Sequence, residues 1–155
     1  MPLIIACDPG VNGGFAWTDS ESFETAPMPP TDSDVCAFIA HLATKAKDVD
    51  LWLEEPPLFA GRNIPGSAIG KLMWNCGVIY GAAYACGFRI RRVRPAVWMK
   101  AHPVGTKGDL TTTAWKNKLK GRAQELFPTL SSGDVTLKTA DALLILDAAI
   151  RGAIN

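Results

Sequence analysis

The sequence predicts one α/β domain built on a mixed sheet. Apolar patterns follow one another as two short strands joined by a tight turn, a third strand, a helix, a strand, a helix, a strand and two helices. The chain has 155 residues, of which 48% are hydrophobic, so it can bury one full core but not two. Repeats, linkers and low-complexity tracts are absent from the sequence, and we therefore expect a single domain over residues 1–155.

The chain is expected to begin with a β-hairpin. Residues 3–7 form an apolar run that ends in Asp8-Pro9-Gly10, and residues 13–17 resume the run after a turn. This places Asp8 at the end of the first strand. A third strand is expected at about 22–25.

A helix and a buried strand are expected next. After a Pro-rich loop at 26–30, an apolar stripe predicts a helix that is capped by Asp32 or Ser33 and runs to about residue 47. Residues 49–53 are largely apolar, as in a central strand. They deliver Glu54 and Glu55 just before two prolines end the strand.

Residues 67–86 predict a long helix that is apolar around most of its surface, with small residues between the large ones. Such a helix must be covered on more than one side. We therefore expect it to be central to the fold and to form part of a dimer interface.

The remaining elements are basic at first and apolar at the end. Residues 88–93 alternate apolar side chains with arginine, which is typical of a strand with one solvated face. Residues 95–108 are expected to form a loop or short helix, and 111–126 a basic amphipathic helix. A final helix over 140–150, started by Thr136 or Thr139, carries Asp141 in its first turns.

Charge is distributed unevenly along the chain. The formal net charge of +1 would by itself argue against a nucleic-acid partner. Residues 1–60 hold ten acidic and two basic side chains, however, whereas residues 89–122 hold ten basic side chains against Asp109 alone. A metal-dependent nuclease needs both features, since carboxylates hold cations and a separate basic surface neutralises phosphates. Ordinary solvated charged surfaces are the alternative explanation.

Composition favours an intracellular, cytoplasmic protein with reduced thiols. No apolar run is long enough for a membrane helix, and the N-terminus lacks the features of a secretory signal. With only His41 and His102 as histidines, a zinc site is not expected. The four cysteines are expected to be buried and reduced: Cys7, Cys36, Cys76 and Cys86.

Three acids stand where strands and helices could bring them together. Asp8 ends one buried strand, Glu54 ends another, and Asp141 lies early in a helix that could pack across both. Two-metal phosphodiester cleavage requires several carboxylates around two cations about 4 Å apart. Magnesium prefers oxygen ligands and keeps several waters, so a few acids suffice. Taken singly, each acid would more often be a strand-end cap or a turn former than a functional residue, and it is the set of three that favours a site.

Here the sequence resembles the RuvC family of Holliday-junction resolvases, within the RNase H-like nucleases. Three segments carry the resemblance in the same order as in the family: Ile4-Ile5-Ala6-Cys7-Asp8-Pro9-Gly10 followed by Gly13-Gly14-Phe15-Ala16, Leu51-Trp52-Leu53-Glu54, and Ala140-Asp141-Ala142-Leu143. The D-P-G motif alone is weak, because sugar-kinase and actin-like folds begin in a similar way. All three segments together span the whole chain.

The resemblance implies an RNase H-like fold with a mixed five-stranded sheet. It also implies Mg²⁺ dependence, with Mn²⁺ as a substitute, and paired symmetric nicks in four-way DNA junctions during recombination and repair. Asp8, Glu54 and Asp141 would be catalytic metal ligands. A homodimer through the helix at 67–86 would match the two-fold symmetry of the junction.

The fourth acidic position of the family is different in this chain. RuvC proteins usually carry an acid three residues before the last aspartate, and some relatives carry histidine there, whereas this chain has Lys138. Lys138 is a candidate catalytic residue that could contact the scissile phosphate or help to deprotonate the water, or it could be simply solvated. Asp134 could supply the missing carboxylate instead. Because Glu54 and Glu55 alternate on a strand, only one of them should reach the metals.

Candidate DNA contacts come from the basic segments and one aromatic residue. Phe59 falls where the family places an aromatic that stacks at the junction centre, although it could also pack under its own loop. Lys100 falls where the family places a basic residue near its active site. Trp74, Trp98 and Trp115 are expected in the core or the dimer interface. The basic candidates for DNA binding are Arg62, Lys100, Lys107, Lys116, Lys118 and Arg122.

Three hypotheses remain open from the sequence. The first is a junction-resolving endonuclease, which the short chain and the altered fourth position suggest is encoded by a phage in a bacterial host. The second keeps the chemistry but acts on flaps, replication forks or RNA/DNA hybrids. The third is a non-catalytic RNase H-like module that binds nucleic acid, with Lys138 marking a decayed metal site.

Overall fold

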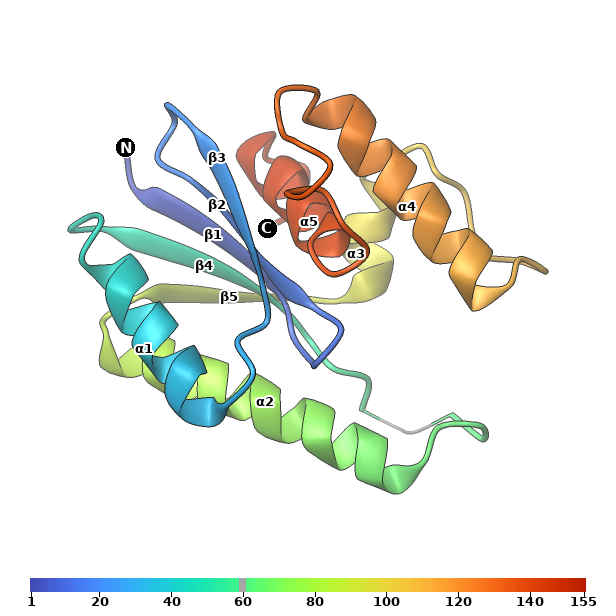
Figure 1. The fold of residues 1–155 in the computed structure, drawn as a ribbon, viewed down its shortest axis with the longest axis horizontal. Helices are drawn as coiled ribbons and strands as arrows, with labels where there is room; N and C mark the ends of the chain where they lie inside the picture. The colour runs from blue at the N-terminus through green and yellow to red at the C-terminus, as the bar shows by residue number, and fades with distance from the viewer. Residues whose placement is uncertain (59–60) are drawn as a thin grey trace.

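A five-stranded mixed sheet forms the centre of the protein (Figure 1). The computed structural model describes residues 1–58 and 61–155. The strands lie in the order β3-β2-β1-β4-β5; the first three pair antiparallel, whereas β1, β4 and β5 run parallel. This confirms the predicted sheet. Its strands are β1 (Leu3–Asp8), β2 (Gly14–Thr18), β3 (Phe23–Pro27), β4 (Val49–Glu54) and β5 (Arg89–Val93).

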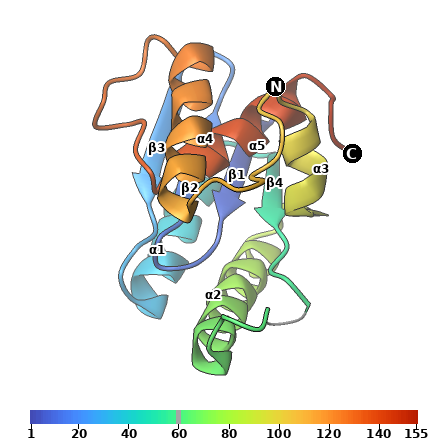
Figure 2. The ribbon, with the colours of Figure 1, turned by 90° about the vertical axis from the view of Figure 1, so that its right-hand side faces the viewer.

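Helices cover both faces of the sheet, so the fold has three layers (Figures 1 and 2). α1 and α2 lie on one side, and α3, α4 and α5 lie on the other. The first half of α2 projects beyond the sheet in both views. The helices are α1 (Asp32–Ala43), α2 (Gly66–Ala85), α3 (Pro95–Lys100), α4 (Thr112–Leu126) and α5 (Ala140–Ile150).

The alternation of side chains along β1 divides the core into two clusters. Ala6 belongs to the cluster under α3, α4 and α5, whereas Ile5 and Cys7 belong to the cluster under α1 and α2. On β4, Trp52 faces the first cluster and Leu53 the second. Because side chains on a strand alternate, the residues that follow at the strand ends continue this pattern.

The bounds of β3 and α1 differ from the sequence prediction. β3 continues through Pro27, because Ala26 and Pro27 pair with β2 where a loop was expected. α1 is capped by Thr31, whose hydroxyl accepts a hydrogen bond from the Asp34 amide at 3.1 Å, and not by Asp32 or Ser33. It ends at Ala43 and not near residue 47.

The expectation of four buried thiols is wrong for two of them. Cys7 and Cys76 are buried, but Cys36 and Cys86 are exposed on α1 and after α2, and all four are unpaired. Neither exposed cysteine lies on the core-facing stripe of its helix. Within the part of the chain that the structure describes, no helix is long and apolar enough to cross a membrane.

Gly14 allows α5 to approach the sheet closely. A Cβ atom at this position would lie 2.7 Å from the Lys138 carbonyl oxygen and 2.6 Å from that of Ala26. Both neighbours are backbone atoms, which cannot rotate away as a side chain can. Only glycine therefore fits between β3 and the segment that leads into α5.

We expect Gly14→Ala to destabilise the protein by about 1–3 kcal/mol, because the added methyl group overpacks this junction. Gly121→Ala in α4 is the matched control: no atom of the described residues lies within 4 Å of its Cβ position, so it should stabilise the helix by roughly 0.5–1 kcal/mol. Urea denaturation measures both changes. Equal effects of the two substitutions would contradict this account of Gly14.

Candidate active site

Asp8 and Glu54 lie side by side because two parallel strands end together. Cys7 of β1 pairs with Leu53 of β4, so Asp8 and Glu54 occupy the next positions on adjacent strands. The alternation that turns Ala6 and Trp52 toward α5 turns both carboxyls the same way. The Asp8 side chain is buried, with a residue exposure of 8%, and Glu54 is half-buried.

α5 brings the third acid to the same place. It packs across β1 and β2, and Asp141 lies in its first turn. The close approach at Gly14, which pairs with Asp8, sets the start of this helix over the end of β1. The positive end of the helix dipole also favours a negative charge there. The fold thus gathers the three predicted acids at one edge of the sheet.

Burial and mutual repulsion raise the pKa values of these carboxyls. The pKa of Asp8 is well above its usual range, first because the group is buried and then because Glu54 and Asp141 are negative. Burial raises the pKa of Glu54 to about 7, and burial also raises that of Asp141.

Lys116 offsets part of this negative charge. It projects from α4, and its Nζ lies 4.0 Å from Asp141 Oδ2. Its positive charge opposes the increase in pKa of all three carboxyls: Asp8, Glu54 and Asp141. The sequence predicted that Lys116 contacts DNA. In the structure its side chain lies beside the three acids.

A buried tryptophan contacts Glu54 from the opposite side. The Trp98 indole Nε1 donates a hydrogen bond of 2.6 Å to Glu54 Oε2. This bond favours the ionised form of Glu54 and lowers its pKa against the effect of burial. Trp98 was expected to be only a core or interface residue. Because 44 positions separate it from Glu54, no local pattern could have revealed the contact.

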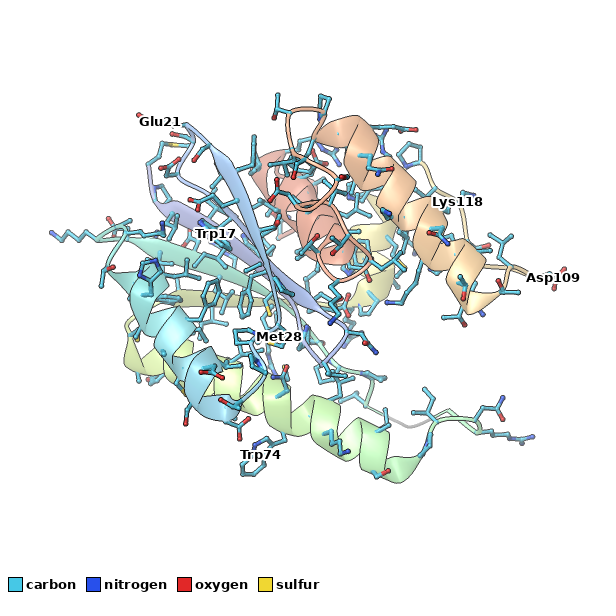
Figure 3. All side chains as sticks on the ribbon, in the orientation of Figure 1. Trp17, Glu21, Met28, Trp74, Asp109 and Lys118 are labelled. Atoms are coloured by element: carbon cyan, nitrogen blue, oxygen red, sulfur yellow. The ribbon has the colours of Figure 1, made fainter. Side chains whose placement is uncertain are left out.

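A pocket of about 560 Å³ opens beside Asp8. Its walls come from the β1–β2 turn at 8–13, the segment 28–30 after β3, one side of α2, and Lys116 and Lys138. Figure 3 labels Met28, which lies between the end of the sheet and α2. The pocket is therefore formed by both helical layers and gives access to the acidic edge of the sheet.

Three lysines line this pocket: Lys71, Lys116 and Lys138. Of these, only Lys116 forms an ion pair within residues 1–58 and 61–155. Asn75 of α2 holds the β1–β2 turn that follows Asp8, because its Oδ1 accepts a hydrogen bond of 2.7 Å from the Gly10 amide. Sequence analysis missed Lys71 and Asn75, because a helical position does not reveal which pocket it faces.

The oxygen donors fit a magnesium-type ion only in part. Mg²⁺ is commonly held by one or two carboxylates and waters, and the neighbouring Asp8 and Glu54 supply such a pair. Among the described residues, however, no group of three histidine, cysteine, aspartate or glutamate side chains is arranged to hold a metal. Asp141 lies against Lys116 instead.

The structure decides between the alternatives for two neighbouring acids. Asp134 does not reach the site, because its carboxylate accepts hydrogen bonds from the amide and hydroxyl of Ser131 at 3.1 and 2.6 Å. Glu55 also lies apart from the cluster: it pairs with Arg92 and Arg94 at 3.6 and 3.5 Å. Of the two consecutive glutamates, only Glu54 joins the other acids.

The other candidates for DNA contact lie in several separate segments between residues 62 and 122. Arg62, Lys100 and Lys107 are exposed. Lys118 points outward from α4, its Nζ 6.0 Å from the centre of the Trp115 ring (Figure 3). Arg122 is engaged within the protein, since its Nη1 pairs with Glu125 at 3.0 Å. Phe59 lies outside the described residues.

Some of the basic side chains in residues 89–122 pair with acidic or aromatic side chains of the protein itself. Arg89 pairs with Asp50 at 2.6 Å and with Asp48 at 3.5 Å. Arg91 lies over the Trp52 ring, 5.3 Å from its centre. Glu55 pairs with Arg92 and Arg94, so the arginines at 89–94 are largely engaged within the protein.

Comparison with known proteins finds relatives in structure but not in sequence. No family model and no curated protein matches the chain. Its structure is similar to Thermus thermophilus RuvC in complex with a Holliday junction substrate, with a TM-score of 0.58 and 17% identity over 99% of this chain and 98% of that one. A second Thermus thermophilus RuvC structure gives a TM-score of 0.56 and 16% identity, covering 97% of each chain. This confirms the predicted RNase H-like fold.

The raised pKa values predict that the acidic cluster destabilises the protein when divalent ions are removed. A carboxyl whose folded pKa lies above its unfolded value makes the protein lose stability as pH rises through that interval. At pH 8 in EDTA, Asp8→Asn should therefore raise Tm by at least about 2–4 °C, the shift that 1 kcal/mol produces in a domain of this size. Thermal melts measure this. A lower Tm for the variant would show that the cluster is not repulsive.

Proposed function

We propose that this chain is a structure-selective, divalent-metal-dependent DNA endonuclease that resolves four-way junctions by paired symmetric nicks. The observation that carries the proposal is the gathering of Asp8, Glu54 and Asp141 at one edge of the sheet, beside a lysine-lined pocket. The fold is shared with RuvC of Thermus thermophilus, which has been solved with a Holliday junction substrate.

The acids would hold Mg²⁺ or Mn²⁺. Asp8 and Glu54 would supply the first ligands and Asp141 a further one, and the bound ions would activate a water and stabilise the leaving oxygen. Because like charges repel, the three carboxylates are more stable with a bound cation or proton than when all three are ionised and nothing is bound. Lys116, at 4.0 Å, opposes the protonation of Asp141.

The lysines would hold the DNA backbone beside the acids. Lys138 and Lys71 line the pocket next to Asp8 and carry charges suited to phosphate oxygens. Lys138 would thus contact the strand at the position where an acid is usual in the family. Farther out, Lys100, Lys107 and Lys118 extend the positive surface over α3 and α4.

The exposed face of α2 would join two copies of the chain. Trp74 is 67% exposed and Tyr84 71%, and Figure 3 shows Trp74 pointing away from the sheet. Glycines on the same helix leave open space at their Cβ positions, which allows close approach of another backbone. Two sites related by a two-fold axis would match a two-fold junction. The open positions are Gly70, Gly77 and Gly81.

Cleavage of a synthetic four-way junction tests the activity. The wild-type chain should nick opposing strands at symmetric positions with Mg²⁺ or Mn²⁺. Glu54→Gln and Asp8→Asn should each reduce nicking by at least about 100-fold and leave junction binding in EDTA intact, since they remove ligands but not the lysines. Glu55→Gln is the matched control and should cleave normally, because Glu55 pairs with the exposed Arg92 and Arg94 and not with the acidic cluster.

Three other outcomes would contradict this proposal. Undiminished nicking by Asp8→Asn would separate the activity from the acidic cluster. Preferred cleavage of flaps, forks or RNA/DNA hybrids in parallel assays would assign a different substrate. Absence of both nicking and protein-dependent Mn²⁺ uptake in calorimetry would indicate a module that only binds nucleic acid.

The dimer is tested by placing a charge on the exposed face of α2. Tyr84→Glu should convert a dimer into a monomer in sedimentation velocity, because a buried, unpaired carboxylate opposes association. The monomer should then make single, uncoordinated nicks. Ile150→Glu is the control on α5, where the side chain is similarly open to solvent at 45% exposure. Dimers that persist in Tyr84→Glu would place the interface elsewhere.

A further inference from the structure

Trp98 is a core residue with a polar contact to the candidate active site. Its side chain is completely buried, at 0% exposure, yet its indole Nε1 donates to Glu54 Oε2 at 2.6 Å. A hydrogen bond from a neutral donor to a carboxylate is among the stronger ones in proteins. Packing alone would not require it, since phenylalanine or leucine could fill an apolar site.

The position of this indole is fixed by the helix that carries Asp141. Trp98 lies in α3, which packs against α5. His102 stands edge-on to the Trp98 ring at a centroid distance of 6.4 Å, and its Nε2 lies 2.8 Å from the Leu144 carbonyl oxygen of α5. The donor to Glu54 and the backbone of Asp141 therefore belong to one packed unit.

An indole is well suited to this task. Its N–H can only donate, does not ionise and has no rotating proton, so it offers one donor in one direction. With Oε2 engaged from the core side, the Glu54 carboxylate cannot turn freely about its last torsion.

We propose that Trp98 is a positioning residue that holds the Glu54 carboxylate toward Asp8 for binding of a divalent cation. This inference rests on the proposed function, because it assigns Glu54 to metal binding. Trp98 itself touches neither metal nor DNA. It acts through the orientation of Glu54, as outer-shell hydrogen bonds do at other metal sites.

Trp98→Phe tests the inference, because it keeps an aromatic ring and removes the N–H. Calorimetric titration of the free protein with Mn²⁺ should show binding weakened by about 10- to 100-fold. Junction binding in EDTA should be unchanged, and the Mn²⁺ concentration for half-maximal nicking should rise by a similar factor. In a Glu54→Gln background, Trp98→Phe should have little further effect on Mn²⁺ binding.

Trp17→Phe provides a closely matched control. Trp17 is also buried, and its indole Nε1 also donates to a glutamate, Glu24, at 3.1 Å. This pair lies on β2 and β3, away from the acidic cluster. Trp17→Phe should therefore bind Mn²⁺ as the wild type does, although it loses a bond of the same kind.

A measurement on the wild-type chain covers the case in which Trp98→Phe does not fold. In a ¹⁵N-labelled sample, the indole N–H resonance of Trp98 should shift during a Mg²⁺ titration, whereas that of Trp17 should not. An unmoved Trp98 resonance, or wild-type Mn²⁺ affinity in folded Trp98→Phe, would overturn the positioning role and leave the nuclease proposal standing. A wild-type chain that takes up no Mn²⁺ would overturn both.

Discussion

Negative charges held close together in a buried place govern much of this structure. Asp8 and Glu54 end adjacent parallel strands, and Asp141 enters from the helix above them. Such a cluster opposes folding when its members are ionised, and the raised pKa values of the three carboxyls express that cost. Two apolar clusters, one on each face of the sheet, keep the strands in register despite the repulsion.

The protein compensates this repulsion with fixed partners of two kinds. Lys116 supplies a full positive charge next to Asp141, and Trp98 supplies a neutral donor to Glu54. Asp8 is the most buried of the three acids and borders the pocket, and the charge of Lys116 lowers its pKa only against the larger effects of burial and of Glu54 and Asp141. The compensation is therefore unequal: Asp141 has a cation at 4.0 Å and Glu54 has a buried donor, whereas Asp8 borders a pocket that Lys71, Lys116 and Lys138 line.

Most helices and strands could be predicted from the sequence, because short local patterns of residues determine them. The span of the last helix and the end of β1 at Asp8 follow from apolar periodicity and turn residues over a few positions. The meeting of Asp8 with Glu54 follows from a general rule, since parallel strands end at one edge of a sheet. The boundary errors at α1 and β3 arise where a nearby hydrogen bond or strand pairing overrides local preference.

The parts of the site that could not be predicted depend on contacts between distant segments. The sequence around Trp98 predicts an ordinary core tryptophan, and none of the neighbouring residues indicates a carboxylate partner. Lys71 and Asn75 face the pocket only because α2 crosses the β1–β2 turn. The arginines of β5 belong to a basic run in the sequence, but the acids that pair with them come from β4 and from the residues on either side of it: Asp48, Asp50 and Glu55.

Low sequence identity to Thermus thermophilus RuvC is consistent with these constraints. At 16% to 17% identity, almost the whole chain still superimposes. A sheet edge that presents carboxylates requires an apolar strand, an acid at its end and a glycine where the helix approaches, and many sequences satisfy that pattern. The charges around the acids are under weaker constraint, because a cation near a carboxylate cluster can come from several elements. A lysine at position 138 is therefore compatible with the same fold, provided that Lys116 and the pocket keep the local charge in balance.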